Sequence, residues 1–315
     1  MAIKIGIVMD PIESITPYKD TTLAMMLAAQ KRGWELWYLQ QSDLYLVDGI
    51  PRARRQQVRV FDDNAHWFEV IEEKDSDMAE LDIVLMRKDP PFNMDFIYTT
   101  YLLERAEAQG VLVSNKPSSL RDVNEKLYTA WFSDFCPPTL VTMNDERIRE
   151  FLAEHGDIIV KPLDGMGGES IFRLQKDGPN TGVVLELMTL RGSRQIMAQR
   201  YLPEIVDGDK RVLVVNGKPV EYALARVPSQ GETRGNLAAG GRGVPVPLSD
   251  TDRQTIAAIA PSLLEKDLLF VGVDIIGTRV TEINVTSPTC VRELEAHADL
   301  DIAGDYLQAL EDKLS

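Results

Sequence analysis

The first third of the chain alternates short apolar runs with amphipathic segments. The runs at 3–8 (IKIGIV) and 81–86 (LDIVLM) are almost wholly apolar, as strands buried on both faces of a sheet are. The segments 21–33 and 96–110 have apolar residues at helical spacing, and each ends on a glycine. A further apolar run follows at 111–114. This β-α-β succession predicts a doubly wound parallel sheet.

Charged residues stand where two of these predicted strands end. Asp10 closes the first strand, and Arg87, Lys88 and Asp89 follow the second apolar run. Because ligands of such sheets bind beyond the carboxyl ends of the strands, these side chains are candidates to line a site. At the start of the first helix, Thr21 is the expected N-cap.

The pattern changes after Pro117 to that of mixed helices and antiparallel strands. We predict a helix at 119–132 that carries Lys126, strands at 139–143, 157–161 and 170–174, and a helix at 144–155. Further on, Asn216-Gly217 is a strong signal for a two-residue hairpin turn. A helix starting at Ser249 has the capping-box pattern with Asp252, and two strands and a final helix close the chain.

The last two predicted strands carry oxygen atoms suited to a metal ion. Asp274 interrupts the run FVGVDIIG, which otherwise suits a buried strand. An isolated buried carboxylate is costly, so Asp274 needs a cation or hydrogen-bond donors nearby. On the next strand Glu282 and Asn284 share one face, and this oxygen set suits Mg²⁺. A solvated polar face with one satisfied buried aspartate is the alternative.

The register of these two strands decides whether the oxygen atoms converge. A two-residue turn at Gly277-Thr278 would place Asp274 on the wrong face for Glu282. A three-residue turn through Arg279 would place the two carboxylates opposite each other. We predict the three-residue turn.

A lysine and a glycine-rich turn end the predicted strand at 157–161. In KPLDGMGGES (161–170) the lysine precedes the glycines, so the segment is neither a Walker A loop nor a dinucleotide fingerprint. Lys161 would project from the strand end beside backbone N–H groups that can approach an anion. The pattern favours a phosphate site, and a plain turn with a solvated lysine is the alternative.

Other basic residues adjoin apolar segments although the net charge is −15. Lys126, Arg211 and Arg226 do so, and Arg234 lies in the glycine-containing stretch 227–242. That stretch is longer than most connections without secondary structure. We predict a lid that closes over a reactive intermediate and excludes water, with a disordered excursion as the alternative.

Composition narrows the class of protein. A chain of 315 residues with 44% hydrophobic and 26% charged residues is typical of a soluble protein with two or three domains. The net charge of −15 argues against nucleic-acid binding, and no apolar run approaches the roughly 20 residues of a membrane span. The N-terminus reads as a strand and not as a signal peptide, so we expect a cytoplasmic protein.

The few histidines and cysteines exclude other kinds of site. His66, His155 and His297 stand in unrelated contexts, and Cys136 is far from Cys290. We therefore expect neither a histidine-based metal site nor a disulfide framework. Cys290 has no base near it in sequence and is interpreted as a small buried residue.

Two further segments have plain interpretations. Trp131 and Phe132 are expected in the core, and the acidic cluster at 72–77 is expected to be a solvated loop.

Seven motifs together resemble those of bacterial glutathione synthetases, a family of ATP-grasp ligases. They are MRKDPPF, RDVNEKLYTAWFSD, KPLDGMGG, DGDKRVLVV, GETRGNLAAGGRG, VGVDIIG and TEINVTSPTC. The resemblance extends from GIVMDPI nearly to the C-terminus. It implies an ATP-grasp fold with an N-terminal α/β domain at 1–122, a central lobe at 123–200 and a C-terminal lobe at 201–315 that bears the lid.

The resemblance also implies a reaction. It is the ATP-dependent ligation of γ-glutamylcysteine and glycine to glutathione through an acyl phosphate, which is the second step of glutathione biosynthesis. ATP would be a co-substrate, and the cofactor would be Mg²⁺, with Mn²⁺ as a substitute. The partners would be these small molecules and further copies of the chain in a tetramer or dimer, with neither nucleic acid nor membrane.

By the same resemblance, individual residues carry defined roles. Phosphoryl transfer would be stabilised by Arg211, Arg226 and Lys161. ATP would be bound by Lys126, Lys161, Gly165, Met166, Gly167, Gly168, Gln199, Arg200, Tyr201, Leu202 and Asp209. The metal ligands would be Asp274, Glu282 and Asn284. The peptide substrate would be bound by Lys19, Arg87, Arg234, Asn236, Ser287 and Thr289.

Other classes fit parts of the pattern. Another ATP-grasp carboxylate–amine ligase would share the phosphate and metal residues and differ at Arg87, the lid and SPTC. A regulatory nucleotide-binding protein would keep the fold without catalysis, although all three expected metal ligands are present. A Rossmann-type dehydrogenase would need G-x-G-x-x-G after the first strand, and that motif is missing there.

Overall fold

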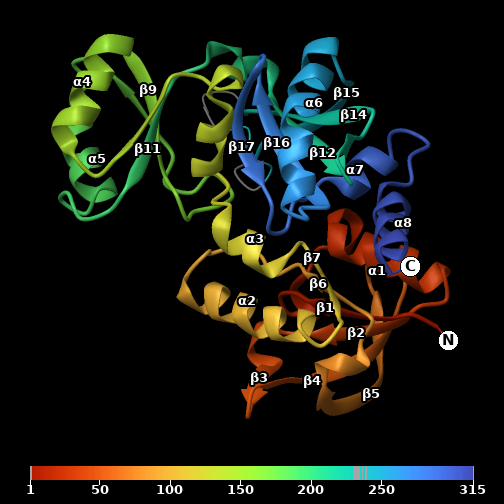
Figure 1. The fold of residues 1–315 in the computed structure, drawn as a ribbon. Coiled ribbons are helices and arrows are strands. Elements are labelled where there is room, and N and C mark those ends of the chain that lie inside the picture. Colours follow the sequence, from red (N-terminus) through yellow and green to blue (C-terminus); the bar gives the residue numbers. More distant parts are fainter. Residues whose placement is uncertain (1, 230–234, 236, 238–239, 315) are drawn as a thin grey trace.

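The structure is a computed structural model that describes residues 2–229, 235, 237 and 240–314. Figure 1 shows three separate sheets, whose strands come from 4–114, 139–200 and 209–284. The predicted domain boundaries at 122 and 200 stay predictions. Arg234, Asn236 and half of the predicted lid lie outside the described residues. Within the described ranges, no helix combines the length and apolar character that crossing a membrane requires.

The N-terminal sheet contains the predicted parallel strands and an antiparallel extension. Its strands are β1 Lys4–Val8, β2 Glu35–Leu39, β3 Leu44–Val47, β4 Ile50–Val60, β5 Phe68–Asp77, β6 Ile83–Met86 and β7 Leu112–Ser114, in the order β3-β4-β2-β1-β6-β7 with β5 on β4. Strands β2, β1, β6 and β7 are parallel, which confirms the doubly wound sheet. The loop predicted at 72–77 is wrong, because these residues pair with β4 as part of β5. The acidic side chains of Glu72, Glu73 and Asp75 are exposed, as expected.

Three helices accompany this sheet: α1 Thr21–Lys31, α2 Met94–Glu107 and α3 Pro117–Asp122. Helix α1 packs with Ile5 and Ile7, whereas α2 packs with Val8 and Val84 on the opposite face. Thr21 is not the N-cap of α1. The carboxylate of Asp20 accepts the backbone N–H of Leu23 at 2.6 Å instead, since Asp20 is the last residue with an extended backbone.

The central sheet is antiparallel and has its own core. Its elements are β8 Thr139–Thr142, α4 Asp145–His155, β9 Asp157–Pro162, β10 Phe172–Gln175, α5 Thr181–Met188 and β11 Ile196–Arg200, with strand order β10-β9-β11-β8. Ile148 on α4 and Leu185 on α5 are fully buried with Ile158, Val160 and Ile196 of the strands.

The C-terminal sheet is also antiparallel. Its elements are β12 Asp209–Val215, β13 Lys218–Pro219, β14 Tyr222–Val227, β15 Arg242–Pro247, α6 Asp250–Glu265, β16 Phe270–Ile276, β17 Arg279–Asn284, α7 Val291–Glu295 and α8 Ile302–Leu314. The strand order is β15-β14-β12-β16-β17, with β13 on β12. The predicted turn is confirmed, because Asn216 and Gly217 have φ values of 46° and 75°, as a type I′ turn requires. The capping box of Ser249 and Asp252 at the start of α6 is also confirmed.

The single helix predicted at 119–132 is wrong. Helix α3 ends at Asp122, Val123 is extended, and a separate 3-10 segment, η5 Leu127–Phe135, follows. The side chain of Asn124 causes the new start, because its Oδ1 accepts the backbone N–H of Leu127 at 2.9 Å. Trp131 is 67% exposed and therefore not a core residue, whereas Phe132 packs partly buried against the core.

The N-terminal and C-terminal sheets share apolar cores. One core joins Ile7 of β1 with Phe270 of β16 and Leu307 of α8, and another joins Val84 of β6 with Val273 of β16. In Figure 1 helix α8 accordingly lies beside α1. The two parts are therefore one packed unit, and the central sheet projects from it (Figure 1).

Candidate active site

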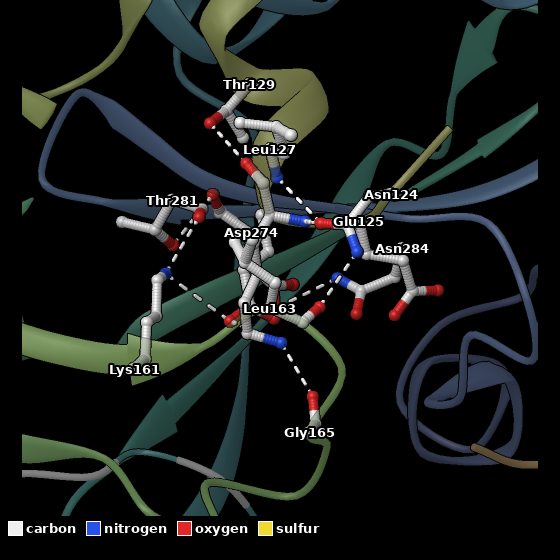
Figure 2. Close-up of polar contacts among 12 residues, drawn as sticks. Asn124, Glu125, Leu127, Thr129, Lys161, Leu163, Gly165, Asp274, Thr281 and Asn284 are labelled. Atoms are coloured by element: carbon white, nitrogen blue, oxygen red, sulfur yellow. Dashed lines mark hydrogen bonds and ion pairs between the residues drawn. The ribbon is translucent and has the colours of Figure 1, made fainter. Parts of the chain in front are cut away.

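Lys126 lies in the break between α3 and η5, and this break is bonded to the glycine-rich turn. Asn124 donates its side-chain N–H to the carbonyl of Leu163 at 2.9 Å (Figure 2). The Lys126 Nζ donates to the carbonyl of Gly165 at 2.6 Å. Because Lys126 is only 4% exposed, its ammonium group is held in place by neighbours and not by water.

Lys161 ends β9 and meets the last strand of the C-terminal sheet. Its Nζ donates to the carbonyl of Thr281 at 3.0 Å and lies 3.4 Å from Glu282 Oε1. The Lys126 Nζ lies 3.8 Å from the same oxygen. Burial alone would raise the pKa of Glu282, but the two lysines hold that pKa below its ordinary value. Burial lowers the pKa of Lys161, and Glu282 opposes this effect.

The predicted pairing of Asp274 with Glu282 is confirmed, but the predicted turn is wrong. The turn has two residues, since Ile276 pairs with Arg279. A β-bulge at Thr281 then shifts the register by one residue and brings Glu282 opposite Asp274. The extra residue leaves the carbonyl of Thr281 outside the regular ladder, where it accepts the bond from Lys161 (Figure 2).

Asp274 is 2% exposed and is surrounded by donors from three strands. Arg211 of β12 binds both of its oxygens, with the Nη2 to Oδ2 distance at 2.9 Å. Arg226 of β14 lies 2.8 Å from Oδ2, and the side chain of Asn284 donates to Oδ2 at 3.2 Å. Burial alone would raise the pKa of Asp274, but the two guanidinium groups hold it well below its ordinary value.

Asp209, at the start of β12, has a different balance of burial and charge. It is paired with Arg226 through Oδ2, while its buried Oδ1 has no hydrogen-bond partner in the described part of the chain. Burial raises the pKa of Asp209 to about 6, because Arg226 only partly offsets the desolvation and Asp274 and Glu282 add repulsion. The free oxygen is available to a ligand donor.

The oxygen donors of β16 and β17 fit Mg²⁺. The carboxylates of Asp274 and Glu282 lie opposite each other across the two strands, and Figure 2 shows the side chain of Asn284 beside Asp274. No cluster of three His, Cys, Asp or Glu side chains able to hold a metal occurs among the described residues. The third protein ligand would therefore be the amide oxygen of Asn284, and such hard oxygen donors suit Mg²⁺.

Two cavities adjoin this group of polar side chains. We term it the charged group; it comprises the charged residues Lys161, Asp209, Arg211, Arg226, Asp274 and Glu282 and the neutral Asn284. The first, here termed the apolar pocket, is about 660 Å³ and has walls that include Ile159, Ile171 and Ile276. The expected nucleotide residues Gln199, Arg200, Tyr201, Leu202 and Asp209 all line it, as do Lys161 and Glu282. A largely apolar pocket with a few charged groups is the usual form of a small-molecule site.

The second cavity, here termed the polar cleft, is about 1440 Å³ and open. Its lining contains the expected substrate residues Lys19, Arg87, Ser287 and Thr289, together with Arg211, Arg226 and Asn284. Met166 and Gly167, which were expected to contact ATP, line this cleft and not the apolar pocket. Arg87 is fixed in it, since its guanidinium donates to Thr22 Oγ1 at 3.2 Å and to the Pro288 carbonyl at 2.9 Å. Ser287 donates to Asp89 at 2.6 Å. Cys290, 1% exposed, is buried as predicted.

Glu125 is a site residue that sequence reasoning missed. Its Oε1 accepts the backbone N–H groups of Val285 and Thr286, at 2.9 and 3.0 Å, and the Thr286 hydroxyl at 2.8 Å. Glu125 thereby fixes the chain directly after Asn284. Its position next to Lys126 was the only signal in the sequence, because its partners lie 160 and 161 residues away.

Comparisons with known proteins cover nearly the whole chain. Residues 3–121 match the family model described as "Prokaryotic glutathione synthetase, N-terminal domain", and residues 125–299 match "Prokaryotic glutathione synthetase, ATP-grasp domain". The chain is 58% identical over 314 residues to a glutathione synthetase of Pseudomonas putida, covering 100% of this chain and 99% of that protein. It is 57% identical over 312 residues to one of Shewanella oneidensis, with 99% of each chain covered.

Solved structures share the fold at low sequence identity. D-cycloserine synthetase DcsG has a TM-score of 0.71 at 17% identity and covers 99% of this chain and 100% of its own. The ATP-grasp ligase PsnB, complexed with minimal precursor, Mg and ADP, has a TM-score of 0.62 at 19% identity, with 98% of each chain covered. These likenesses confirm the predicted ATP-grasp fold.

Proposed function

The chain belongs to the prokaryotic glutathione synthetase family, and we propose that it joins γ-glutamylcysteine to glycine in an ATP-dependent reaction. The enzyme is an ATP-grasp ligase. The observation that carries the proposal is the charged group between the apolar pocket and the polar cleft. A nucleotide in the first cavity and a carboxylate in the second would meet at the same cations.

The proposed reaction has two steps that need no nucleophile from the protein. In the first, a cysteinyl carboxylate oxygen attacks the γ-phosphorus of ATP, the bond from that phosphorus to the β–γ bridging oxygen breaks, and ADP leaves. In the second, the glycine nitrogen attacks the acyl phosphate carbon, phosphate leaves, and the nitrogen loses a proton. Such phosphoryl transfer depends mainly on positioning and charge stabilisation.

Particular side chains would supply this stabilisation. Lys126 and Lys161 would neutralise the nucleotide phosphates, since both ammonium groups are buried beside the glycine-rich turn. Arg211 and Arg226 line the polar cleft and would face the transferring phosphoryl group. Fixed cations in a buried site cost little reorganisation during reaction, which is why such arrangements lower barriers.

Mg²⁺ fits this proposal through Asp274, Glu282 and Asn284. When bound, the ion neutralises phosphate charge and orients the phosphates. The charge of the two carboxylates is balanced by Lys126, Lys161, Arg211 and Arg226. These ion pairs hold the ligands in a pre-arranged position.

Three further elements belong to the proposal by family resemblance. They are a lid at 227–242 that includes Arg234 and Asn236, assembly as a tetramer or dimer, and a cytoplasmic location. The lid has a physical task in the mechanism, because an acyl phosphate exposed to water would hydrolyse.

The test measures ADP release with ATP and Mg²⁺ while γ-glutamylcysteine and glycine are added separately and together. Turnover with both substrates, matched by an equal amount of glutathione, is the expected result. Turnover only with a different acid and amine would keep the ligase mechanism and overturn the substrate assignment. ATP binding without turnover on any pair would instead indicate a regulatory nucleotide-binding protein.

A further inference from the structure

A buried arginine lies in the antiparallel extension of the N-terminal sheet. Arg55 of β4 is 1% exposed, and Trp37 of the neighbouring strand β2 is 4% exposed. The guanidinium carbon of Arg55 lies 4.7 Å from the centre of the Trp37 ring. Neither residue lines the apolar pocket or the polar cleft. The proposed reaction therefore does not explain why this charge is buried.

The two side chains have nitrogen donors without a partner. The Nε and Nη1 atoms of Arg55 and the Nε1 atom of Trp37 are shielded from water and have no hydrogen-bond partner in the described part of the chain. Cation–π attraction between the guanidinium group and the ring stabilises the charge, but it does not satisfy N–H groups that lie in the planes of the two groups. Because native structures generally pair such buried atoms, these donors need an acceptor.

The charge of Arg55 is also incompletely balanced. Its Nη2 donates to Glu80 Oε2 at 2.7 Å, and Lys74 Nζ pairs with the same oxygen. These contacts join two cations to one carboxylate, although the net charge of the chain is −15. Burial lowers the pKa of Arg55, and the charges of Glu80 and Glu72 oppose this effect without cancelling it. A further negative charge beside Arg55 would therefore be stabilising.

An anion fits these donors better than a water molecule does. The N–H groups of arginine and tryptophan only donate hydrogen bonds. A water molecule that accepted two of them would still need acceptors for its own two hydrogens, whereas an anion only accepts. The burial of both side chains limits such an ion to a small one.

We propose that Arg55 and Trp37 bind a small monovalent anion of the halide class through their guanidinium and indole N–H groups. The ion would tie the antiparallel strand β4 to β2, which is the neighbour of β1 in the parallel part of the sheet. This site goes beyond the proposed function, because it takes neither the nucleotide nor the acid and amine substrates.

Unfolding in two sodium salts tests the proposal. Urea unfolding is measured in bromide and, at the same ionic strength, in gluconate, whose anion is too large for a buried site. A ligand that binds only the folded state and is present at ten times its Kd lowers the unfolding constant about 10-fold. We expect wild type to gain a factor of this size from bromide, relative to a variant without the site.

Two variants remove the donors. Arg55→Met keeps a long side chain without N–H groups, and the bromide effect should vanish in it. Trp37→Phe keeps an aromatic ring without the indole N–H. Its Kd for bromide should rise about 10-fold to 100-fold, the range for losing one hydrogen bond to a charged group.

Arg59→Met is the matched control, since it removes an exposed arginine from the same strand. It should keep the full bromide effect of wild type. An effect of equal size in Arg55→Met and Arg59→Met would be a general effect of the salt and would overturn the proposal.

Diffraction from wild-type crystals soaked in bromide locates the ion without any variant. We expect anomalous signal in contact with the guanidinium group of Arg55 and the indole nitrogen of Trp37. Bromide found only elsewhere would overturn the proposal. Bromide found there without any bromide effect on unfolding in solution would be an adventitious ion only, which would overturn it as well.

Discussion

At the scale of single residues, the site depends on buried charges that hold one another in place. Asp274 carries its negative charge in the interior because Arg211 and Arg226 bind it from two strands. The sequence indicated that Asp274 needed a partner, and both arginines stood out beside apolar segments. Their direct pairing was not foreseen, since it joins residues 63 and 48 positions apart on three strands.

Asp274→Asn should therefore affect both activity and stability. We expect Mg²⁺-dependent ADP release to fall at least 100-fold. The substitution removes the negative charge of a side chain that would bind the metal ion and that also pairs with Arg211 and Arg226. The free energy of unfolding should fall by about 3–5 kcal/mol, the usual cost of breaking a buried ion pair. Denaturant unfolding and steady-state kinetics measure the two effects. Wild-type kinetics in this variant would remove Asp274 from the metal site.

Glu107, the last residue of α2, should make stability depend on pH. Burial raises its pKa to about 7; Lys116 opposes this, and Glu104 and Asp267 reinforce it. The unfolded chain releases this proton near its ordinary pKa of about 4.3, so the folded state binds more protons between about pH 4.3 and 7. Stability from this group is therefore present at low pH and is lost as pH rises through about 7.

Glu107→Gln should remove that dependence. At pH 8 the variant should be more stable than wild type by less than about 2 kcal/mol, because solvent screens this half-buried group. Near pH 4 the difference should vanish or reverse in sign. Urea unfolding at several pH values measures it. An unchanged pH slope in the variant would show that Glu107 is not the group responsible.

At the scale of elements, the hairpin of β16 and β17 shows how one extra residue positions a site. The two-residue turn alone would place Thr281 opposite Asp274. The bulge at Thr281 corrects the register and also presents a carbonyl to Lys161. A bulge has almost no local sequence pattern. The sequence therefore predicted the correct pairing of Asp274 with Glu282 from a three-residue turn, whereas the structure reaches it through a two-residue turn and a bulge.

Deleting Thr281 should separate these two effects. The regular ladder would keep Asp274 opposite Glu282, so we expect the fold to persist. Lys161 would lose a charge-assisted bond, and kcat/KM should fall about 10-fold to 100-fold. Thr281→Ser, which keeps the bulge and its carbonyl, is the matched control and should retain near-wild-type activity. Equal kinetics in deletion and control would show that the carbonyl has no role.

For the whole molecule, the hydrophobic cores do not follow the order of the three sheets along the chain. Residues of the N-terminal and C-terminal sheets are buried together, and Asn115 binds the backbone of Leu269, Phe270 and Val285 across this junction. The central sheet has a separate core around Ile148. Local stability should therefore follow the shared cores and not the order of the chain.

Ile148→Ala tests this division. Removing a fully buried side chain should cost about 2–5 kcal/mol within its own core. Amide hydrogen exchange should quicken in residues 139–200, with little change in the other two sheets. Val273→Ala is the contrasting variant, since it should quicken exchange in both of those sheets together. Uniformly faster exchange in both variants would indicate a single cooperative unit.

Local sequence patterns predicted the succession of strands and helices, the candidate charged residues and the family. These follow from local periodicity, capping residues and short motifs. Only the packing of the folded chain sets the break before Lys126, the bulge at Thr281, the free oxygen of Asp209 and the sharing of cores. Each of these depends on contacts between residues far apart in the chain, as in Lys161 and Thr281 at a separation of 120 positions. Local patterns contain no information about such partners, because burial and pairing are settled only when the sheets pack together.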